Sequence, residues 1–244
     1  MSVAPLSMNI LAIGAHPDDI ELGCGGLLLK ASRQDHHNIF MYTLTRGGAS
    51  GDPEERTKEL MKSAKFIGAR RLWIDNFEDT KLSLSSDLIN HIEFFIKKAD
   101  PDIVLTHSLG DTHHDHRAIA ASTMEAGRFV PNILAYEIPV TRDFKPQVYY
   151  DISDVIEGKI QLINIFWSQR SKSFLQSNAI RGLAQYRALQ SRFNNSVTCV
   201  EAFEVQKLFF GKEFKLMNVP QENGSRALHE QMPKEVIESI STQV

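Results

Sequence analysis

The feature that most constrains the fold is an alternation of short apolar runs with longer amphipathic segments. The run MNILAIGA at 8–15 is continuously apolar, as expected of a strand that is covered on both faces. Similar runs occur at 38–45, 70–76 and 102–108, and helical patterns occur at 22–34, 51–68, 85–100 and 113–129. Strands that alternate with helices of this length predict an α/β fold. We expect a Rossmann-like, doubly wound, mostly parallel sheet with helices on both faces.

The segment 51–68 has the clearest helix boundaries. Asp52 can cap the amino end, Pro53 suits the first helical position, and Gly68 can end the helix. Later strands are predicted at 132–138, 147–152 and 199–210, and later helices near 153–173 and 178–193. The remaining residues are polar and lack strong periodicity. We therefore predict one domain at 1–211 and a polar C-terminal tail at 212–244, with one short helix at 233–240.

Composition excludes several classes of protein. A chain of 244 residues, 42% of them hydrophobic, can bury a substantial core without disulfides. The formal charge of -3 gives no basic signature, so neither nucleic acid nor an anionic membrane is the expected partner. The apolar run near the amino end is too short to span a bilayer. Two cysteines make no disulfide framework and indicate a reducing compartment, so we expect a soluble cytoplasmic protein.

Two polar clusters follow predicted strands. His16, Asp18 and Asp19 come directly after the first strand, and the stretch HSLGDTHHDH at 107–116 follows the fourth. In an open parallel sheet, ligands bind beyond the carboxyl ends of the strands, near the point where the strand order reverses. The first and fourth strands usually flank that point. Clusters about 100 residues apart in sequence are therefore expected to form one site.

The residue types in these clusters suit a metal centre. Imidazole and carboxylate bind zinc and related divalent ions, and a catalytic zinc site uses about three protein ligands. A further carboxylate can accept a proton from water, and a further histidine can stabilise an oxyanion. The stretch HPDD at 16–19 is equally compatible with a turn whose aspartate hydrogen-bonds the backbone and leads into a helix. Spacing alone leaves both interpretations open.

The glycines at 23–26 raise the alternative of a dinucleotide site. The run GCGG does not match G-x-G-x-x-G, and the second strand is followed by Arg46 where an acidic residue would be needed. A nicotinamide cofactor is therefore not expected. The glycines instead allow the start of the helix to pack closely against its surroundings.

Two motifs together resemble those of a known family. GAHPDDIELGCGG at 14–26, followed by DTHHDHRA at 111–118, resembles the PIG-L/LmbE-like zinc-dependent N-deacetylases over about residues 8–210. The resemblance implies a metal, Zn²⁺ or another divalent ion, bound by His16, Asp19 and His116. It also implies Asp18 as general base, His113 as the group that stabilises the tetrahedral intermediate or acts as acid, and Asp115 as the residue that orients His113.

Other positions match the family less closely. His114 stands where the family usually has proline, which adds a donor but is not expected to change the ligands. Arg56, in EERTKE, matches a family arginine and is expected to contact substrate. Arg142 is a second candidate for substrate binding, because its loop can reach over the pocket. The pair Ser168–Gln169 resembles another family feature.

The resemblance implies an enzyme that removes the N-acetyl group from an N-acetylglucosamine-type sugar or glycoconjugate and releases acetate. Its expected partner is that small N-acetylated molecule, and by resemblance the chain is expected to form a homo-oligomer. One alternative is a metal-dependent amidase that acts on another amide, since a fold and a metal site fix the reaction better than the substrate. A second alternative is a metal-containing binding protein without activity. The presence of Asp18 argues against it, because a structural metal site needs no free base.

Overall fold

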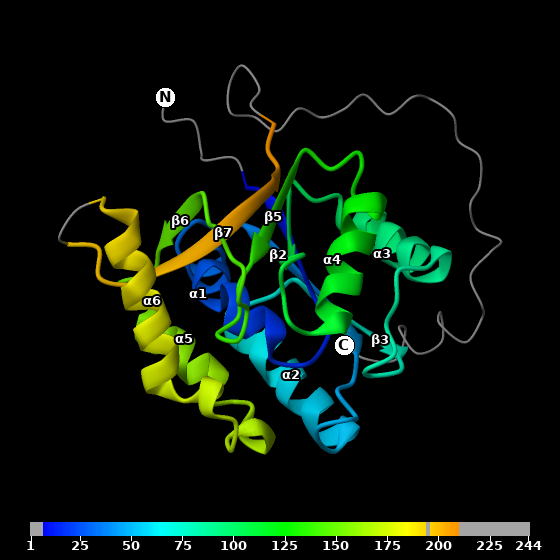
Figure 1. Ribbon diagram of the computed structural model, residues 1–244, viewed down its shortest axis with the longest axis horizontal. Helices are drawn as coiled ribbons and strands as arrows, with labels where there is room; N and C mark the ends of the chain where they lie inside the picture. Colours follow the sequence, from blue (N-terminus) through cyan, green and yellow to red (C-terminus); the bar gives the residue numbers. More distant parts are fainter. Residues whose placement is uncertain (1–6, 194–195, 210–244) are drawn as a thin grey trace. The chain divides into compact units, whose positions relative to one another are not determined.

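A computed structural model describes residues 7–193 and 196–209 (Figure 1). The strands are Asn9–Gly14 (β1), Asn38–Thr45 (β2), Arg71–Phe77 (β3), Ile103–His107 (β4), Asn132–Tyr136 (β5), Val148–Asp151 (β6) and Val200–Lys207 (β7). The α-helices are Asp19–Arg33 (α1), Pro53–Ile67 (α2), Ser86–Ala99 (α3), His114–Ala126 (α4), Ile156–Ile163 (α5) and Ser177–Ser191 (α6). Two short 3₁₀ turns, Trp167–Gln169 (η1) and Ser173–Leu175 (η2), separate α5 from α6.

The strands of the described residues form one sheet in the order β3-β2-β1-β4-β5-β7-β6. The first five strands of that order are parallel, while β7 runs antiparallel between β5 and β6. Strand β1 lies between β2 and β4, so Ala12 pairs with Met41 on one side and with Leu105 on the other. The strand order therefore reverses between β1 and β4. The predicted doubly wound, mostly parallel α/β fold is confirmed.

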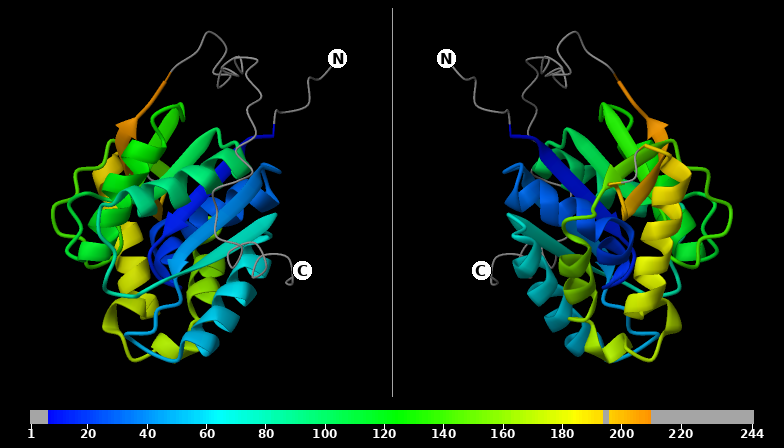
Figure 2. Two further views of the ribbon diagram at one scale, coloured as in Figure 1. Left: turned by 90° about the vertical axis from the view of Figure 1, so that its right-hand side faces the viewer. Right: turned by 90° about the vertical axis from the view of Figure 1, so that its left-hand side faces the viewer.

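Helices cover both faces of the sheet (Figure 2). Helices α3 and α4 pack together on one face, and α1, α2, α5 and α6 form a connected layer on the other. The predicted ends of α2 agree closely with the structure: the Asp52 side chain accepts a hydrogen bond from the Glu54 backbone N–H, and Gly68 adopts the left-handed conformation at the carboxyl end. Ser85 caps α3 in the same way, through the backbone N–H of Leu88.

Two predicted helices differ from the structure. The helix expected over 153–173 ends at Ile163, because the next turn is fixed by side-chain hydrogen bonds to other elements that local pattern does not reveal. Helix α1 begins at Asp19, three residues before the predicted start, and is kinked at Cys24. A Cβ atom on Gly23 would lie 2.1 Å from the Tyr136 ring, so glycine is required there for α1 to approach β5.

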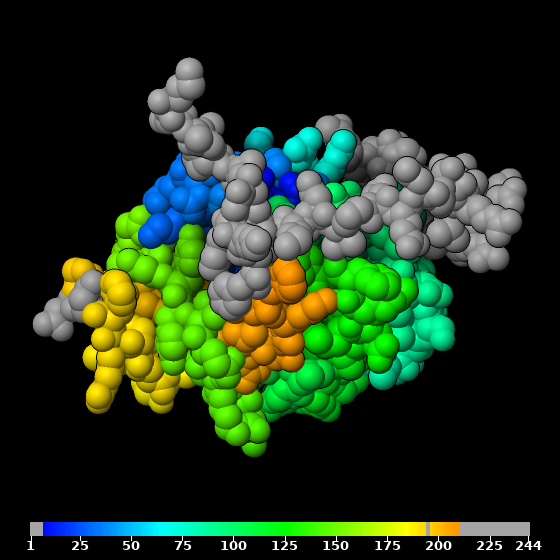
Figure 3. Space-filling view, turned by 90° about the horizontal axis from the view of Figure 1, so that it is seen from above, coloured from blue at the N-terminus to red at the C-terminus, as the bar shows by residue number. Residues whose placement is uncertain are grey.

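The chain beyond β7 is only partly described. Phe209 donates its backbone N–H to Asn132 Oδ1 over 3.1 Å, and on the surface in Figure 3 the β7 segment, in orange, lies beside green residues. The predicted tail at 212–244 and its helix at 233–240 lie outside the described residues. Among the helices that are described, none has the length and apolar character needed to cross a membrane.

Candidate metal centre and active site

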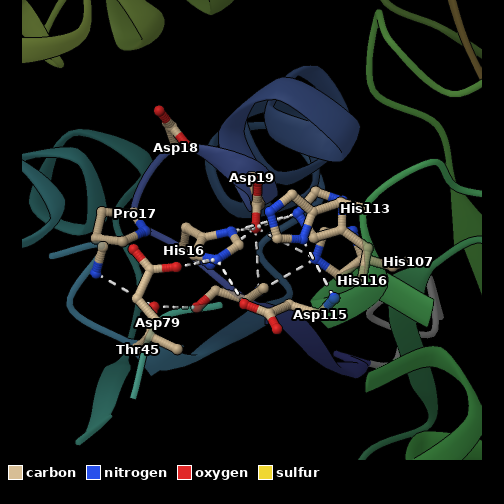
Figure 4. Close-up of polar contacts among 12 residues, drawn as sticks. His16, Pro17, Asp18, Asp19, Thr45, Asp79, His107, His113, Asp115 and His116 are labelled. Atoms are coloured by element: carbon tan, nitrogen blue, oxygen red, sulfur yellow. Dashed lines mark hydrogen bonds and ion pairs between the residues drawn. The ribbon is translucent and has the colours of Figure 1, made fainter. Parts of the chain in front are cut away.

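The two polar clusters meet at the carboxyl ends of β1 and β4. His16 follows β1, Asp19 begins α1, and His116 lies in the first turn of α4. All three side chains are buried. Figure 4 shows the Asp19 carboxylate pointing toward the imidazole side chains of His16 and His116. The reversal of strand order therefore brings together the three residues predicted as metal ligands.

The ligand atoms of these residues form a nearly equilateral triangle. His16 Nδ1 lies 3.2 Å from Asp19 Oδ2, and His116 Nε2 lies 3.3 Å from Asp19 Oδ2 and 3.3 Å from His16 Nδ1. Zinc–ligand bonds of about 2.05 Å at tetrahedral angles place neighbouring ligand atoms about 3.3 Å apart. The spacing and chemistry of the donors therefore fit a tetrahedral divalent ion with one position left for a small molecule.

The outer nitrogens of both histidines face carboxylates. His16 Nε2 lies 2.8 Å from Asp79 Oδ1 and 3.1 Å from Asp115 Oδ2. His116 Nδ1 lies 3.1 Å from Asp111 Oδ1. A carboxylate at one ring nitrogen fixes the tautomer and leaves the other nitrogen's lone pair for a metal. The supporting contacts therefore select His16 Nδ1 and His116 Nε2 as the ligand atoms.

The surroundings also set the charges of the cluster. Burial opposes ionisation of Asp19, but the imidazoles of His116, His16 and His107 hold its pKa well below the usual range. Burial lowers the pKa of His16 and His116, but nearby carboxylates outweigh it. Asp19 and other carboxylates raise the pKa of His16 well above normal, and Asp19 and Asp111 raise that of His116 to about 9. Without a metal, these shifts favour protonated imidazoles beside an ionised Asp19; a bound cation would take the place of those protons, because histidine binds metal in its neutral form.

The contact of Asp115 differs from the sequence expectation, which assigns its carboxylate to His113. The carboxylate instead lies against His16, and it also accepts hydrogen bonds from the backbone N–H groups of Thr80 and Leu82. The hydrogen bond to His113 comes from the Asp115 backbone N–H, over 3.2 Å. The carboxylate is directed to His16 because the loop after β3 supplies donors on that side.

His107 supports the cluster from the end of β4. Its Nε2 accepts a 3.1 Å hydrogen bond from the Ala15 backbone N–H and lies 3.3 Å from Asp19 Oδ2. Its ring stacks on that of His116 with centroids 3.9 Å apart. Complete burial, together with His116, lowers the pKa of His107 to about 4. His107 is therefore a neutral ring that packs behind the predicted ligands.

Asp18 is adjacent to Asp19 in the chain, but its side chain points in a different direction. Its carboxylate points away from the imidazoles, whereas that of Asp19 points toward them (Figure 4). The backbone φ of Asp18 is 106°, a conformation that is costly for a residue with a Cβ atom. Burial raises its pKa to about 6, although Arg56 acts in the opposite direction. A carboxyl with this pKa can take up and release a proton near neutral pH.

Arg56 is 1% exposed and is bound to the turn that carries Asp18. Its Nη1 donates to the Gly47 carbonyl and to Ser50 Oγ, and its Nη2 donates to the Pro17 carbonyl and lies 3.3 Å from Asp18 Oδ2. Gly47 has a φ of 70°, and a Cβ atom there would lie 2.0 Å from the guanidinium. All of these Arg56 contacts are within the protein, one of them with Asp18. A contact between Arg56 and substrate stays a prediction.

His113 caps the amino end of α4. Its Nδ1 accepts the Asp115 backbone N–H, so the neutral ring carries its proton on Nε2. Burial and the neighbouring imidazoles of His116 and His16 lower the pKa of His113. A neutral, half-buried imidazole with a free N–H is suited to donate a hydrogen bond to an oxyanion.

The rim of the site includes the second predicted arginine. Arg142 is exposed, and the neighbouring Thr141 donates its hydroxyl to Asp111 Oδ2 over 2.7 Å. Arg142 thus lies in a loop attached to the centre, and its role in substrate binding stays a prediction. Sequence reasoning did not assign Asp79 or Asp111. Both follow strands that end at the site, and that position is the signal that could have found them.

Comparisons with known proteins identify the family that the chain resembles. The family model described as GlcNAc-PI de-N-acetylase, PIG-L, matches residues 11–127. The uncharacterized deacetylase YaiS of Escherichia coli K12 is 36% identical over 162 residues, which cover 63% of this chain and 87% of that protein. The diacetylchitobiose deacetylase of Thermococcus kodakarensis is 28% identical over 188 residues, covering 66% of this chain and 70% of that protein.

The fold also occurs in a protein with another reaction. The 4-carboxy-2-hydroxymuconate hydratase GalB of Pseudomonas putida KT2440 superposes with a TM-score of 0.73 at 19% identity, covering 84% of this chain and 99% of that one. This likeness concerns the fold alone. Membership of a family is shown instead by sequence, since the chain is 36% identical to YaiS over 87% of that protein's length. The chain belongs to the PIG-L family of deacetylases.

Proposed function

We propose that the protein is a metal-dependent hydrolase that removes the N-acetyl group from an N-acetylglucosamine-type sugar or glycoconjugate and releases acetate. The observation that carries this proposal is the triangle of ligand atoms from His16, Asp19 and His116, with edges of 3.2 to 3.3 Å. Its dimensions fit Zn²⁺, and other divalent ions accept the same donors. Asp18, next to Asp19 in the chain, is the proposed proton acceptor, and His113, whose ring lies against those of His16 and His116, is the proposed hydrogen-bond donor.

The protein groups would divide the work of amide hydrolysis. A divalent ion bound by the three ligands would supply Lewis acidity, which acidifies water and polarises a carbonyl. Asp18 takes the proton of the attacking water, and its raised pKa suits that step. His113 donates its Nε2–H to the oxyanion of the tetrahedral intermediate. The proton held by Asp18 passes to the departing nitrogen as the C–N bond breaks, so acetate and a free amino sugar result.

A sugar substrate is supported by the relatives. The similarity to a diacetylchitobiose deacetylase favours an N-acetylated sugar over other amides. We also propose a cytoplasmic location, because Cys24 and Cys199 are both free thiols. Nucleic acid is not proposed as a partner, since the chain has a formal charge of -3. Association into a homo-oligomer stays a prediction.

The test measures acetate release from N-acetylglucosamine and N,N′-diacetylchitobiose, with and without a chelator. We expect release from at least one sugar, loss of release with chelator, and recovery on addition of Zn²⁺. Asp18→Asn should retain metal but lose at least about 100-fold in kcat, because it removes the proton acceptor. His116→Ala should lose metal, as measured by elemental analysis.

Three results would contradict the proposal. Release that is insensitive to chelator would exclude the metal mechanism. Normal turnover by Asp18→Asn would exclude Asp18 as the base. Release from a panel of other N-acetylated amines but from neither sugar would replace the proposed substrate with another amide.

A further inference from the structure

The pair Ser168–Gln169 forms a buried polar junction away from the metal ligands. Glu59, on α2, accepts hydrogen bonds from the Ser168 backbone N–H over 2.8 Å and from Ser168 Oγ over 2.6 Å. Gln169 is 1% exposed, and its Nε2 lies 3.1 Å from Ser168 Oγ. These contacts hold η1 against α2, at the point where the predicted helix over 153–173 is interrupted.

Gln169 extends this junction to the loop after β2. Its Nε2 donates to the Ser50 carbonyl over 3.2 Å, and its Oε1 accepts from Ser50 Oγ over 3.4 Å. The same Ser50 Oγ accepts a 2.7 Å hydrogen bond from Arg56 Nη1. Ser50 can therefore donate to Gln169 while it accepts from Arg56, so one amide fixes both the backbone and the hydroxyl of Ser50.

Arg56 completes the chain of contacts at the turn that carries Asp18. Its Nη2 donates to the Pro17 carbonyl over 2.6 Å and lies 3.3 Å from Asp18 Oδ2. Among the ion pairs of the described residues, the one that involves the Asp18 carboxylate is with Arg56. Asp18 has a left-handed backbone, which persists only when surrounding groups hold it. Arg56 therefore contacts both the backbone of this turn and the Asp18 carboxylate.

We propose that Ser168 and Gln169 are positioning residues, which fix the Asp18 carboxylate through Ser50 and Arg56. This inference rests on the proposed function, in which Asp18 accepts the proton of the attacking water. The pair touches none of the predicted metal ligands, so its effect should fall on turnover and leave metal binding intact. Misplacement of a catalytic group by about 1 Å can cost about 100-fold in rate.

The test compares Gln169→Ala with Gln176→Ala as a matched control. Gln176 lies in the same segment and donates its side-chain N–H to the Arg170 carbonyl, and it takes no part in the hydrogen bonds described for Ser50. We expect Gln169→Ala to lower kcat for N,N′-diacetylchitobiose by about 10- to 100-fold. Its KM and metal content should match those of the control, and kcat is compared at a temperature at which both variants are folded, because loss of the buried Gln169 amide lowers stability.

A second comparison identifies the route. Residues that act through one another give non-additive effects. In an Arg56→Lys background, Gln169→Ala should therefore cause no further loss of kcat. Hydrogen exchange offers a readout that does not need turnover: the amides of 46–51 should exchange faster in Gln169→Ala than in the control.

The outcomes separate this inference from the proposed function. If the wild-type protein releases no acetate from any sugar tested, the proposed function fails, and the inference about turnover fails with it even where loop exchange changes. If the wild-type protein is active, the inference alone is overturned by either of two results. These are a kcat for Gln169→Ala equal to that of Gln176→Ala, or a loss that is fully additive with Arg56→Lys.

Discussion

At the scale of single residues, Asp111 contacts His116 on the side opposite its predicted ligand nitrogen. Asp111 Oδ1 lies 3.1 Å from His116 Nδ1, and its Oδ2 accepts the hydroxyl of Thr141. Burial opposes ionisation of this carboxyl, but His116 and other partners lower its pKa to about 2. The ionised form therefore prevails near neutral pH, where it can hold His116 Nδ1–H and increase the basicity of Nε2.

Asp111→Asn should weaken Zn²⁺ binding by about tenfold or more, because the amide lacks the charge that makes His116 a better ligand. Competition with a chromophoric chelator measures the affinity. Asp143→Asn is the control, since Asp143 is exposed and contacts only the exposed Lys145 among the ion pairs described. Equal Kd values for Asp111→Asn and the wild-type protein would show that Asp111 does not support the ligand.

The sequence indicates the candidate metal ligands better than the residues that would orient them. His16, Asp19 and His116 are predictable because they occur in two distinctive motifs at strand ends. Asp79 stands in no such motif, and its contact with His16 depends on the path of the loop after β3. The partner of the Asp115 carboxylate differs from the prediction for the same reason: adjacency in sequence favours His113, whereas the tertiary structure places the carboxylate against His16.

At the scale of elements, α1 depends on a buried ion pair from two other elements. The helix is broken at Cys24, which would leave backbone groups without partners on both sides of the kink. Glu201, on β7, accepts the N–H groups of Gly26 and Leu27 over 2.7 Å each, and Lys159, on α5, donates to the Leu22 carbonyl. The glycine pattern at 23–26 predicts close packing, but local sequence gives no indication of this distant pair.

Glu201→Gln should lower the free energy of unfolding by about 3 kcal/mol, because it leaves the Lys159 ammonium buried without its charge partner. Denaturant unfolding followed by circular dichroism gives the value. The control is Glu78→Gln, which breaks an exposed pair with Lys81 and should cost less than about 1 kcal/mol. Similar losses for both variants would show that the pair with Lys159 is no more important than a surface contact.

At the scale of the whole domain, the candidate metal centre joins the two halves of the parallel sheet. His16 and Asp19 belong to the β1–α1 connection, and His116 belongs to α4, which connects β4 to β5. The alternation of strands and helices predicts this meeting point, because it fixes where the strand order reverses. It does not predict the antiparallel β7 between β5 and β6, since that pairing depends on contacts between residues far apart in sequence.

Metal binding should therefore stabilise the domain as a whole. An ion that binds the folded chain at about 100 times its Kd contributes about 2.7 kcal/mol, because the unfolded chain does not assemble the three ligands. For a chain of 244 residues this corresponds to a rise in Tm of about 5 to 10 °C. Differential scanning calorimetry of chelator-treated protein, before and after addition of Zn²⁺, measures the shift. His116→Ala should show little of it, because one of the three ligands is missing. An equal rise in that variant would place the stabilising ion elsewhere, and no rise in the wild-type protein would contradict the metal centre.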